Sequence, residues 1–384
     1  MKQATRPFAV ISADSHFTEP QDLWLRHIEP AYRDRAPHVE HGPDTDLFVC
    51  DTGEMFPVGM IHGVRYKGGD VTVEGRYADV PPSGWDHDAR LEAMRQDGVS
   101  AEVLYPTIAM RFYTIEDTAF AAACIRAYNT WAAGFCGADP ARFRGVGMVA
   151  LDDVDAACTE MRRCKELGLA GIMIAVHPDG ADPYHADRYL PFWATAEELR
   201  LPISLHTATE RRVRAALSPA QFFLHYALVQ PVLIGMIYAG LFDRFPHLQV
   251  VSVENDAGWA AHTIERMDYV DVTARFRNLN PNHHNEKAPS HYWHNNISYT
   301  FMRDHTAVAM RQAIGVDRLM WSSDFPHGDS TWPDSQQVID DLFAGVPEDE
   351  QRMILHDNAA RLYGFPTSST APSESERTAA GARQ

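Results

Sequence analysis

The chain of 384 residues contains few cysteines and no long apolar segment. None of the five cysteines forms a CxxC pair, and their odd number and wide spacing argue against a disulfide framework or a cysteine zinc site. The first residues, MKQATRPFAV, contain no apolar run long enough for a signal peptide. No stretch approaches the length of a membrane span. The sequence therefore predicts a cytoplasmic protein with no membrane partner.

Positive charge is also scarce in this chain. There are 34 Lys and Arg residues against 52 Asp and Glu residues, which gives a formal net charge of −18 at pH 7. Nucleic acids and anionic membranes attract proteins that carry an excess of positive charge, so neither is expected as a partner. The acidity does not define a substrate, because one local positive charge can outweigh the global field. We expect a small-molecule substrate.

Eight short apolar runs recur along the chain, and helical patterns separate most of them. The runs are almost continuously hydrophobic, which is typical of parallel strands that are covered by helices. This alternation predicts an α/β protein of the (β/α)8, or TIM-barrel, type. An open doubly wound sheet is the alternative, although no GxGxxG loop follows the first run. The expected strands are 8–16, 100–108, 143–151, 170–176, 201–208, 248–256, 295–302 and 318–327.

A single barrel domain is expected over residues 1–365. Residues 17–84 do not follow the alternation, since they are rich in Gly, Pro, Asp and aromatic residues. They predict a long insertion after the first strand, partly a β-hairpin, that caps the barrel mouth. Residues 366–384 are polar and have no apolar period, which predicts a disordered tail. The expected helices are 86–97, 117–135, 153–167, 188–199, 218–243, 258–275 and 304–315.

Polar residues stand at the expected C-terminal ends of the strands, where (β/α)8 barrels have their active sites. Asp14 and His16 end the first strand, and because they are two residues apart their side chains point to the same side. His206 ends the fifth strand, and Asp324 ends the eighth. Each residue alone could be a buried, hydrogen-bonded side chain or a cap. Together, imidazole and carboxylate groups form a competent ligand set for a divalent ion.

Several segments of the chain resemble the amidohydrolase superfamily. The resemblance is specific to the branch that includes aminocarboxymuconate-semialdehyde decarboxylase and γ-resorcylate decarboxylase, and it covers residues 8–365. It implies one divalent metal ion, Zn²⁺ or Mn²⁺, bound by Asp14, His16, His206 and Asp324. The segments that carry the resemblance are ADSHFTEP, ARLEAMRQDGVSAEVLYPT (89–107), LFDRFPHLQVV (241–251), WSSDFPH (321–327) and NAARLYGF (358–365).

The resemblance also implies catalytic roles at three positions. Asp324 is expected to bind the metal, to activate its water, or to do both. Many relatives carry a histidine at the end of the sixth strand, but this chain carries Glu254 there. Glu254 could transfer a proton if burial raised its pKa, or it could orient a metal ligand. His225 could act as an acid or base over the mouth, or it could be a packing histidine.

Four further residues are candidates for binding the substrate. Arg211 and Arg212 lie on the loop after the fifth strand and could hold a carboxylate as a bidentate fork, although a solvated surface position is equally open. Glu19 could turn back towards the site. His327 could contact the substrate or hold the loop after the eighth strand.

The acid-x-His start of the chain resembles the decarboxylases more than the His-x-His hydrolases. The segment GIMIAVHPDG at the end of the fourth strand contains no lysine that could bridge two metal ions. The expected function is therefore the non-oxidative decarboxylation of an aromatic or unsaturated carboxylic acid. A hydrolase or hydratase that uses a metal-bound water needs the same ligands and stays open, as does an inactive barrel that binds a ligand. The resemblance also implies a homo-oligomer, a dimer or tetramer.

Overall fold

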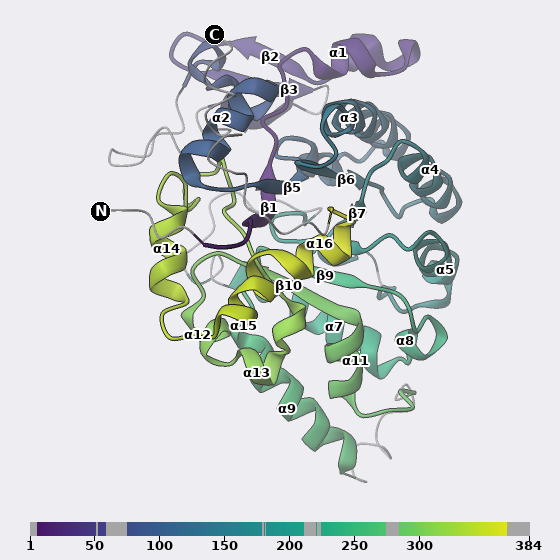
Figure 1. The fold of residues 1–384 in the computed structure, drawn as a ribbon. Helices are drawn as coiled ribbons and strands as arrows, with labels where there is room; N and C mark the ends of the chain where they lie inside the picture. Colours follow the sequence, from purple (N-terminus) through teal and green to yellow (C-terminus); the bar gives the residue numbers. More distant parts are fainter. Residues whose placement is uncertain are drawn as a thin grey trace.

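Eight parallel strands form a barrel that helices surround in the computed structural model (Figure 1). The predicted (β/α)8 barrel is thereby confirmed. The strands are β1 (Ile11–His16), β5 (Ala101–Tyr105), β6 (Phe143–Met148), β7 (Gly171–Ile174), β8 (Ile203–His206), β9 (Val250–Val253), β10 (Ile297–Phe301) and β11 (Leu319–Trp321), hydrogen-bonded in this order. The structure describes residues 6–50, 53–58, 75–178, 180, 182–210, 220, 224–273 and 284–366.

Main-chain hydrogen bonds close the barrel between its first and last strands. The N–H of Asp324 donates to the carbonyl of Asp14 at 2.9 Å, and the N–H of His16 donates to the carbonyl of Phe325 at 2.7 Å. Closure leaves no open sheet edge in the barrel. It also places the end of β1 beside the segment that follows β11, although more than 300 residues separate them in the sequence.

Aspartates fix the start of several surrounding helices. The side chains of Asp86, Asp117, Asp153 and Asp304 each accept a hydrogen bond from the backbone of the helix that follows, which satisfies a donor left free by the helix geometry. The helices around the barrel are α2 (His87–Asp97), α3 (Thr118–Ala138), α4 (Val154–Glu166), α5 (Leu190–Leu199), α7 (Val229–Tyr238), α8 (Leu241–Arg244), α9 (Gly258–Val272), α11 (Pro289–Asn296), α12 (His305–Ala309), α13 (Arg311–Ile314), α14 (Ser335–Leu342), α15 (Glu348–Arg352) and α16 (Asn358–Tyr363).

Two of the expected helices are shorter or divided in the structure. In the described part of 218–243, Gly240 has a left-handed backbone (φ 70°) and separates α7 from α8. The expected helix 304–315 is divided into α12 and α13 at Met310. Among the described helices, none is both long enough and apolar enough to cross a membrane.

The insertion after β1 contains more regular structure than the predicted hairpin. The helix α1 (Leu23–His27) precedes an antiparallel sheet of β2 (His38–His41), β3 (Asp46–Cys50) and β4 (Gly53–Pro57). Figure 1 shows these elements beside α3 at the top of the view. The Trp24 ring contacts Phe48 of this sheet and Phe112 of the barrel loop, and its indole N–H donates to the Cys124 carbonyl at 3.1 Å. That the insertion caps the mouth stays a prediction, and the expected tail, 366–384, lies outside the described residues except for Pro366.

Arg90 of α2 joins the closing strands from outside the barrel. Its guanidinium is 1% exposed and donates to Glu102 Oε2 on β5 at 2.7 Å. The same group donates to the His16 carbonyl at 2.7 Å and approaches the Phe325 carbonyl at 3.5 Å. One buried cation thus holds three segments at the end of the barrel where the site lies.

We predict that Arg90→Met lowers the free energy of unfolding by about 3–5 kcal/mol, because the Glu102 carboxylate is left buried without its partner. Urea denaturation measures this change. The double variant Arg90→Met/Glu102→Met should recover most of the loss, since no uncompensated charge then remains. The control is Arg95→Met, whose ion pair with Glu92 is exposed and should leave the midpoint unchanged. Equal midpoints for Arg90→Met and the control would contradict the role of Arg90.

Candidate metal centre

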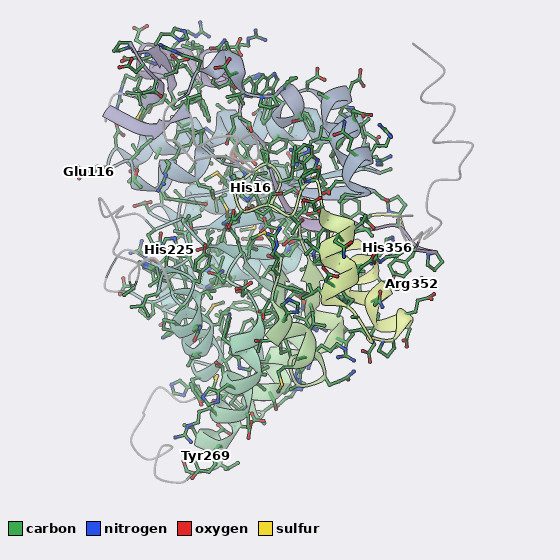
Figure 2. All side chains as sticks on the ribbon, turned by 90° about the vertical axis from the view of Figure 1, so that its left-hand side faces the viewer. His16, Glu116, His225, Tyr269, Arg352 and His356 are labelled. Atoms are coloured by element: carbon green, nitrogen blue, oxygen red, sulfur yellow. The ribbon has the colours of Figure 1, made fainter. Side chains whose placement is uncertain are left out.

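The four predicted ligands converge at one end of the barrel, and all four are fully buried. His16 Nε2 lies 3.2 Å from Asp324 Oδ1 and 3.5 Å from Asp14 Oδ1. His206 Nε2 lies 3.5 Å from the same Asp14 oxygen and 3.3 Å from His16 Nε2. Figure 2 shows His16 in the middle of the molecule. The ligand atoms of Asp14, His16, His206 and Glu254 all lie within 4.8 Å of one another, and Asp324 adjoins this cluster through His16.

Backbone carbonyls orient both imidazole rings. His16 Nδ1 lies 2.7 Å from the Pro106 carbonyl, and His206 Nδ1 lies 2.8 Å from the Thr207 carbonyl. A carbonyl only accepts, so each Nδ1 carries the hydrogen, and each Nε2 faces the cluster. This is the usual arrangement for metal-binding histidines, whose second nitrogen donates to a neighbouring acceptor.

The cluster has the chemistry and the spacing that a divalent ion needs. Among the described residues, Asp14 Oδ1 is buried and has no hydrogen-bond partner, although it faces both Nε2 atoms. A tetrahedral ion with bonds of roughly 2.0–2.1 Å would hold its ligands about 3.3 Å apart. The separations of 3.2–3.5 Å agree with this value. The residues therefore fit a bound divalent metal ion.

The carboxylates of the cluster favour a positive charge between them. Burial disfavours a charged His16, but the close Asp14 and Asp324 carboxylates outweigh burial and raise its pKa well above the ordinary value. Burial likewise opposes ionisation of Asp14, yet His206 and His16 lower the pKa of this carboxyl. The cluster can therefore accommodate either a proton or a divalent metal ion between its carboxylates, and the two would compete.

Four non-glycine residues at this end of the barrel have a left-handed backbone. They lie one to three residues beyond the ends of β8, β9 and β11, and their φ angles lie between 53° and 59°. Side chains rarely tolerate this conformation, and strained residues of this kind concentrate at functional sites. The residues are Ala208, Glu254, Asp256 and Asp324.

Glu254 stands at the end of β9, beside the cluster. Its N–H donates to Thr300 Oγ1 at 2.9 Å, and one carboxylate oxygen lies 3.7 Å from His206 Nδ1. Burial raises the pKa of Glu254 well above its ordinary value, and the Asp324 and Asp14 carboxylates raise it further. Asp324 differs, since His327 and His16 outweigh burial and lower the pKa of its carboxyl. Of the Glu254 and Asp324 carboxyl groups, Glu254 therefore retains a proton more readily.

His225 lies near the cluster, but its nitrogens are engaged elsewhere. The N–H of Ala208 donates to His225 Nε2 at 2.9 Å, so the hydrogen of the neutral ring is on Nδ1. Nδ1 lies 2.9 Å from Glu210 Oε1. Figure 2 shows His225 nearer to the surface than His16. In this geometry both ring nitrogens of His225 contact the turn that follows His206, as the packing alternative expects, and a catalytic role for His225 stays a prediction.

The predicted substrate-binding residues have different positions. Glu19 is fully buried, and its carboxylate accepts the N–H groups of residues 107–109 at 3.0–3.1 Å, so it fixes the loop after β5. His327 Nδ1 lies 2.9 Å from Asp324 Oδ1, and its Nε2 lies 3.1 Å from Thr107 Oγ1. His327 thus holds the loop after β11 against the metal centre. Arg211 and Arg212 lie outside the described residues.

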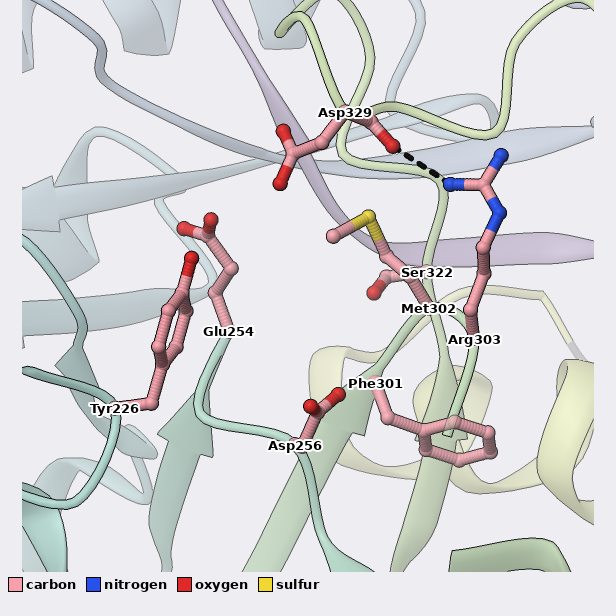
Figure 3. A pocket seen from close by; sticks show the side chains of 8 residues that line it. All are labelled: Tyr226, Glu254, Asp256, Phe301, Met302, Arg303, Ser322 and Asp329. Atoms are coloured by element: carbon pink, nitrogen blue, oxygen red, sulfur yellow. Dashed lines mark hydrogen bonds between the residues drawn. The ribbon is translucent and has the colours of Figure 1, made fainter. Parts of the chain in front are cut away.

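A pocket of about 270 Å³ opens beside Glu254 (Figure 3). No sequence pattern points to Tyr226 or Met302, whereas Asp256 and Asp329 follow Glu254 and Asp324 by two and five residues. Partial burial, with the Asp304 and Asp329 carboxylates, raises the pKa of Asp256 to about 6. The lining residues are Tyr226, Glu254, Asp256, Phe301, Met302, Arg303, Ser322 and Asp329.

The sequence profile of the amidohydrolase family matches residues 13–365. The γ-resorcylate decarboxylase of Rhodococcus jostii is 27% identical over 317 residues, which cover 74% of this chain and 92% of the relative. A crystal structure of an amidohydrolase from Mycobacterium avium subsp. paratuberculosis has a TM-score of 0.73 and 21% identity, and the match covers 94% of this chain and 100% of the other.

A second crystal structure is similar in fold. It is the 5-carboxyvanillate decarboxylase of Novosphingobium aromaticivorans in complex with manganese and 4-hydroxy-3-methoxy-5-nitrobenzoic acid. The TM-score is 0.67 at 19% identity, and the match covers 95% of this chain and 100% of the other. Both structural matches support the barrel fold.

We predict that His225→Ala weakens metal binding by about tenfold, because Ala208 loses the acceptor that holds the turn after His206. His225→Gln keeps an acceptor and should bind metal more tightly than His225→Ala. Calorimetric titration of each protein with manganese gives the dissociation constants. If His225→Ala binds metal like the parent but loses a titrating step in its pH–rate profile, the acid–base role is correct instead.

Proposed function

The chain belongs to the amidohydrolase family, and we propose that it is a divalent-metal-dependent decarboxylase of an aromatic or unsaturated carboxylic acid. The observation that carries this proposal is the group of Asp14, His16, His206 and Glu254, whose ligand atoms lie within 4.8 Å of one another, with the buried Asp324 carboxylate 3.2 Å from His16. The name of the Rhodococcus jostii relative, γ-resorcylate decarboxylase, supports this reaction class.

The proposed metal ligands are His16 and His206 through Nε2, and Asp14 and Asp324 through carboxylate oxygens. Two imidazoles and two carboxylates suit zinc, and the share of oxygen ligands also suits manganese. Manganese in the Novosphingobium decarboxylase supports the second choice. When bound, the metal supplies a Lewis acid that polarises an oxygen of the substrate.

Glu254 is the proposed proton donor. In a decarboxylation, the ring carbon gains a proton, the bond from this carbon to the carboxylate breaks, and carbon dioxide leaves. The donor must be protonated when the substrate binds and must stand at the substrate pocket. Glu254 meets both conditions, because its pKa is raised and it lines the pocket beside the cluster. Asp324, whose pKa is lowered, suits metal binding better than proton donation.

Neighbouring residues are proposed to keep these groups in position. His327 and His16 approach the Asp324 carboxylate from two sides. Thr300 Oγ1 accepts the Glu254 N–H and lies 3.4 Å from Asp14 Oδ2, so it links the proton donor to a ligand. A small organic acid is the proposed substrate. A homodimer or homotetramer and a cytoplasmic location remain predictions from the sequence.

We predict that the metal-loaded protein releases carbon dioxide from at least one acid in a panel of hydroxybenzoates and muconate-type acids. Glu254→Gln should lower kcat by about 100-fold or more, because the amide cannot donate an acidic proton. Its metal content should equal that of the parent. Glu116→Gln, which changes an exposed glutamate (Figure 2), is the matched control and should keep full activity. Hydrolysis or hydration of panel compounds without carbon dioxide release would show that the reaction class is wrong.

A further inference from the structure

The turn that carries Glu254 has a strained backbone. It joins the end of β9 to the start of α9, and in it Glu254 (φ 55°) and Asp256 (φ 53°) both have the left-handed conformation. Figure 3 shows these two residues on the segment that leaves the strand. For residues other than glycine this conformation is unfavourable, and it persists only where neighbouring contacts hold it. The position of the Glu254 carboxyl therefore depends on what anchors the turn.

The Asp304 side chain anchors the end of this turn that is farther from β9. Asp304 follows β10, and its Oδ2 accepts the N–H groups of Ala257 at 2.8 Å and of Gly258 at 2.6 Å. Its Oδ1 accepts the N–H of Ala307 at 2.8 Å, at the start of α12. One carboxylate thus satisfies free donors at the starts of two helices, α9 and α12.

Gly258 allows this close approach. A Cβ at this position would lie 2.9 Å from Asp304 Oδ1 and 2.7 Å from Thr306 Cβ, so one of the two segments would have to move. Glycine is the residue that permits such contact between backbone and a neighbouring group. The sequence therefore builds the junction of α9 with the segment after β10 at two positions, Gly258 and Asp304.

The same neighbouring strand holds the end of the turn that is nearer to β9. The Glu254 N–H donates to Thr300 Oγ1 on β10 at 2.9 Å. Between the two ends, the indole N–H of Trp259 donates to the Asn255 carbonyl at 3.0 Å. None of the four proposed metal ligands lies on β10, yet Thr300 and Asp304 hold the turn on both sides of Glu254. This strand and the segment after it organise the site without entering it.

We propose that Asp304 is a positioning residue for the proton donor. Its two hydrogen bonds to the start of α9 keep the turn in the left-handed form that places the Glu254 carboxyl between His206 and the pocket. This inference rests on the proposed function. Without these hydrogen bonds the turn can relax to negative φ, which carries the Glu254 side chain away. A displacement of about 1 Å is enough to lower the rate of a catalysed step severely.

Asp304→Ser tests the anchor while it keeps a cap on α12. Serine is a favourable N-cap residue, but its single oxygen lies on a shorter side chain, so it can serve Ala307 and leaves the start of α9 without an acceptor. We expect kcat for carbon dioxide release to fall at least about tenfold, while KM changes less than about threefold, because the groups that bind the substrate are unchanged. The metal content should equal that of the parent.

Gly258→Ala disturbs the same junction and keeps the charge of Asp304. It should lower kcat by a similar factor, because the added methyl group separates α9 from Asp304. Asp153→Ala is the matched control. Asp153 caps α4 by accepting the N–H of Ala156 at 3.0 Å, so its loss removes a cap of the same kind and should leave kcat unchanged. An equal fall of kcat in Asp153→Ala would overturn the inference.

A double-variant cycle shows whether Asp304 acts through Glu254. In Glu254→Gln no proton donor remains to be positioned, so the addition of Asp304→Ser should lower kcat by less than about twofold. A purely structural role of Asp304 would instead lower kcat by the same factor in both backgrounds. A further tenfold fall in the Glu254→Gln background would therefore overturn the inference.

Amide hydrogen exchange separates this inference from the proposed function. In the protein as purified, without substrate, the N–H groups at positions 257 and 258 should exchange at least about tenfold faster in Asp304→Ser and Gly258→Ala than in the parent. Faster exchange in the variants, with no carbon dioxide released by the parent, would support the anchor and contradict the decarboxylase. Carbon dioxide release by the parent, with variants that keep the parental kcat or exchange rates, would support the decarboxylase and contradict the role of Asp304.

Discussion

Closure of the barrel between β1 and β11 is the constraint on which the rest of the structure depends. The hydrogen bond from the Asp324 N–H to the Asp14 carbonyl, 2.9 Å long, brings the two ends of the barrel chain together. Without this contact, the proposed ligands on the first strand and after the last strand would not be held close together. Arg90 reinforces the same junction from outside, through the His16 carbonyl and Glu102. Fold stability and the assembly of the site are therefore linked at one place.

The closed barrel concentrates acceptors of hydrogen bonds where water does not reach. Backbone carbonyls fix the tautomers of His16 and His206, and their free nitrogens face the Asp14 carboxylate. A buried carboxylate oxygen without a hydrogen-bond partner is costly, and Asp14 Oδ1 is in this state among the described residues, so a cation held by the cluster would stabilise it. The charges of Asp14 and Asp324 also act on the neighbouring Glu254, whose pKa they raise together with burial. The proposed metal binding and proton donation thus depend on the same buried carboxylates.

Much of this could be predicted from the sequence, because it depends on local patterns. Apolar runs located the eight strands of the barrel, and their polar ends located Asp14, His16, His206 and Asp324. The position of a side chain relative to a distant backbone could not be predicted in this way. Glu19 meets the amide groups of the loop after β5, and His225 accepts from Ala208, whose left-handed conformation has no signature in the sequence. The division of helix 218–243 at Gly240 was likewise missed, since its apolar pattern continues across the glycine.

The measurement that tests the central claim most directly is metal analysis by mass spectrometry. The protein is purified without added metal, together with Asp14→Ala and His206→Ala. The account predicts about one zinc or manganese ion per chain in the parent, and loss of the ion in both variants, because each removes a ligand from the buried cluster. A parent that contains no metal, even after incubation with zinc or manganese, would contradict the account and would leave a barrel that serves only to bind a ligand.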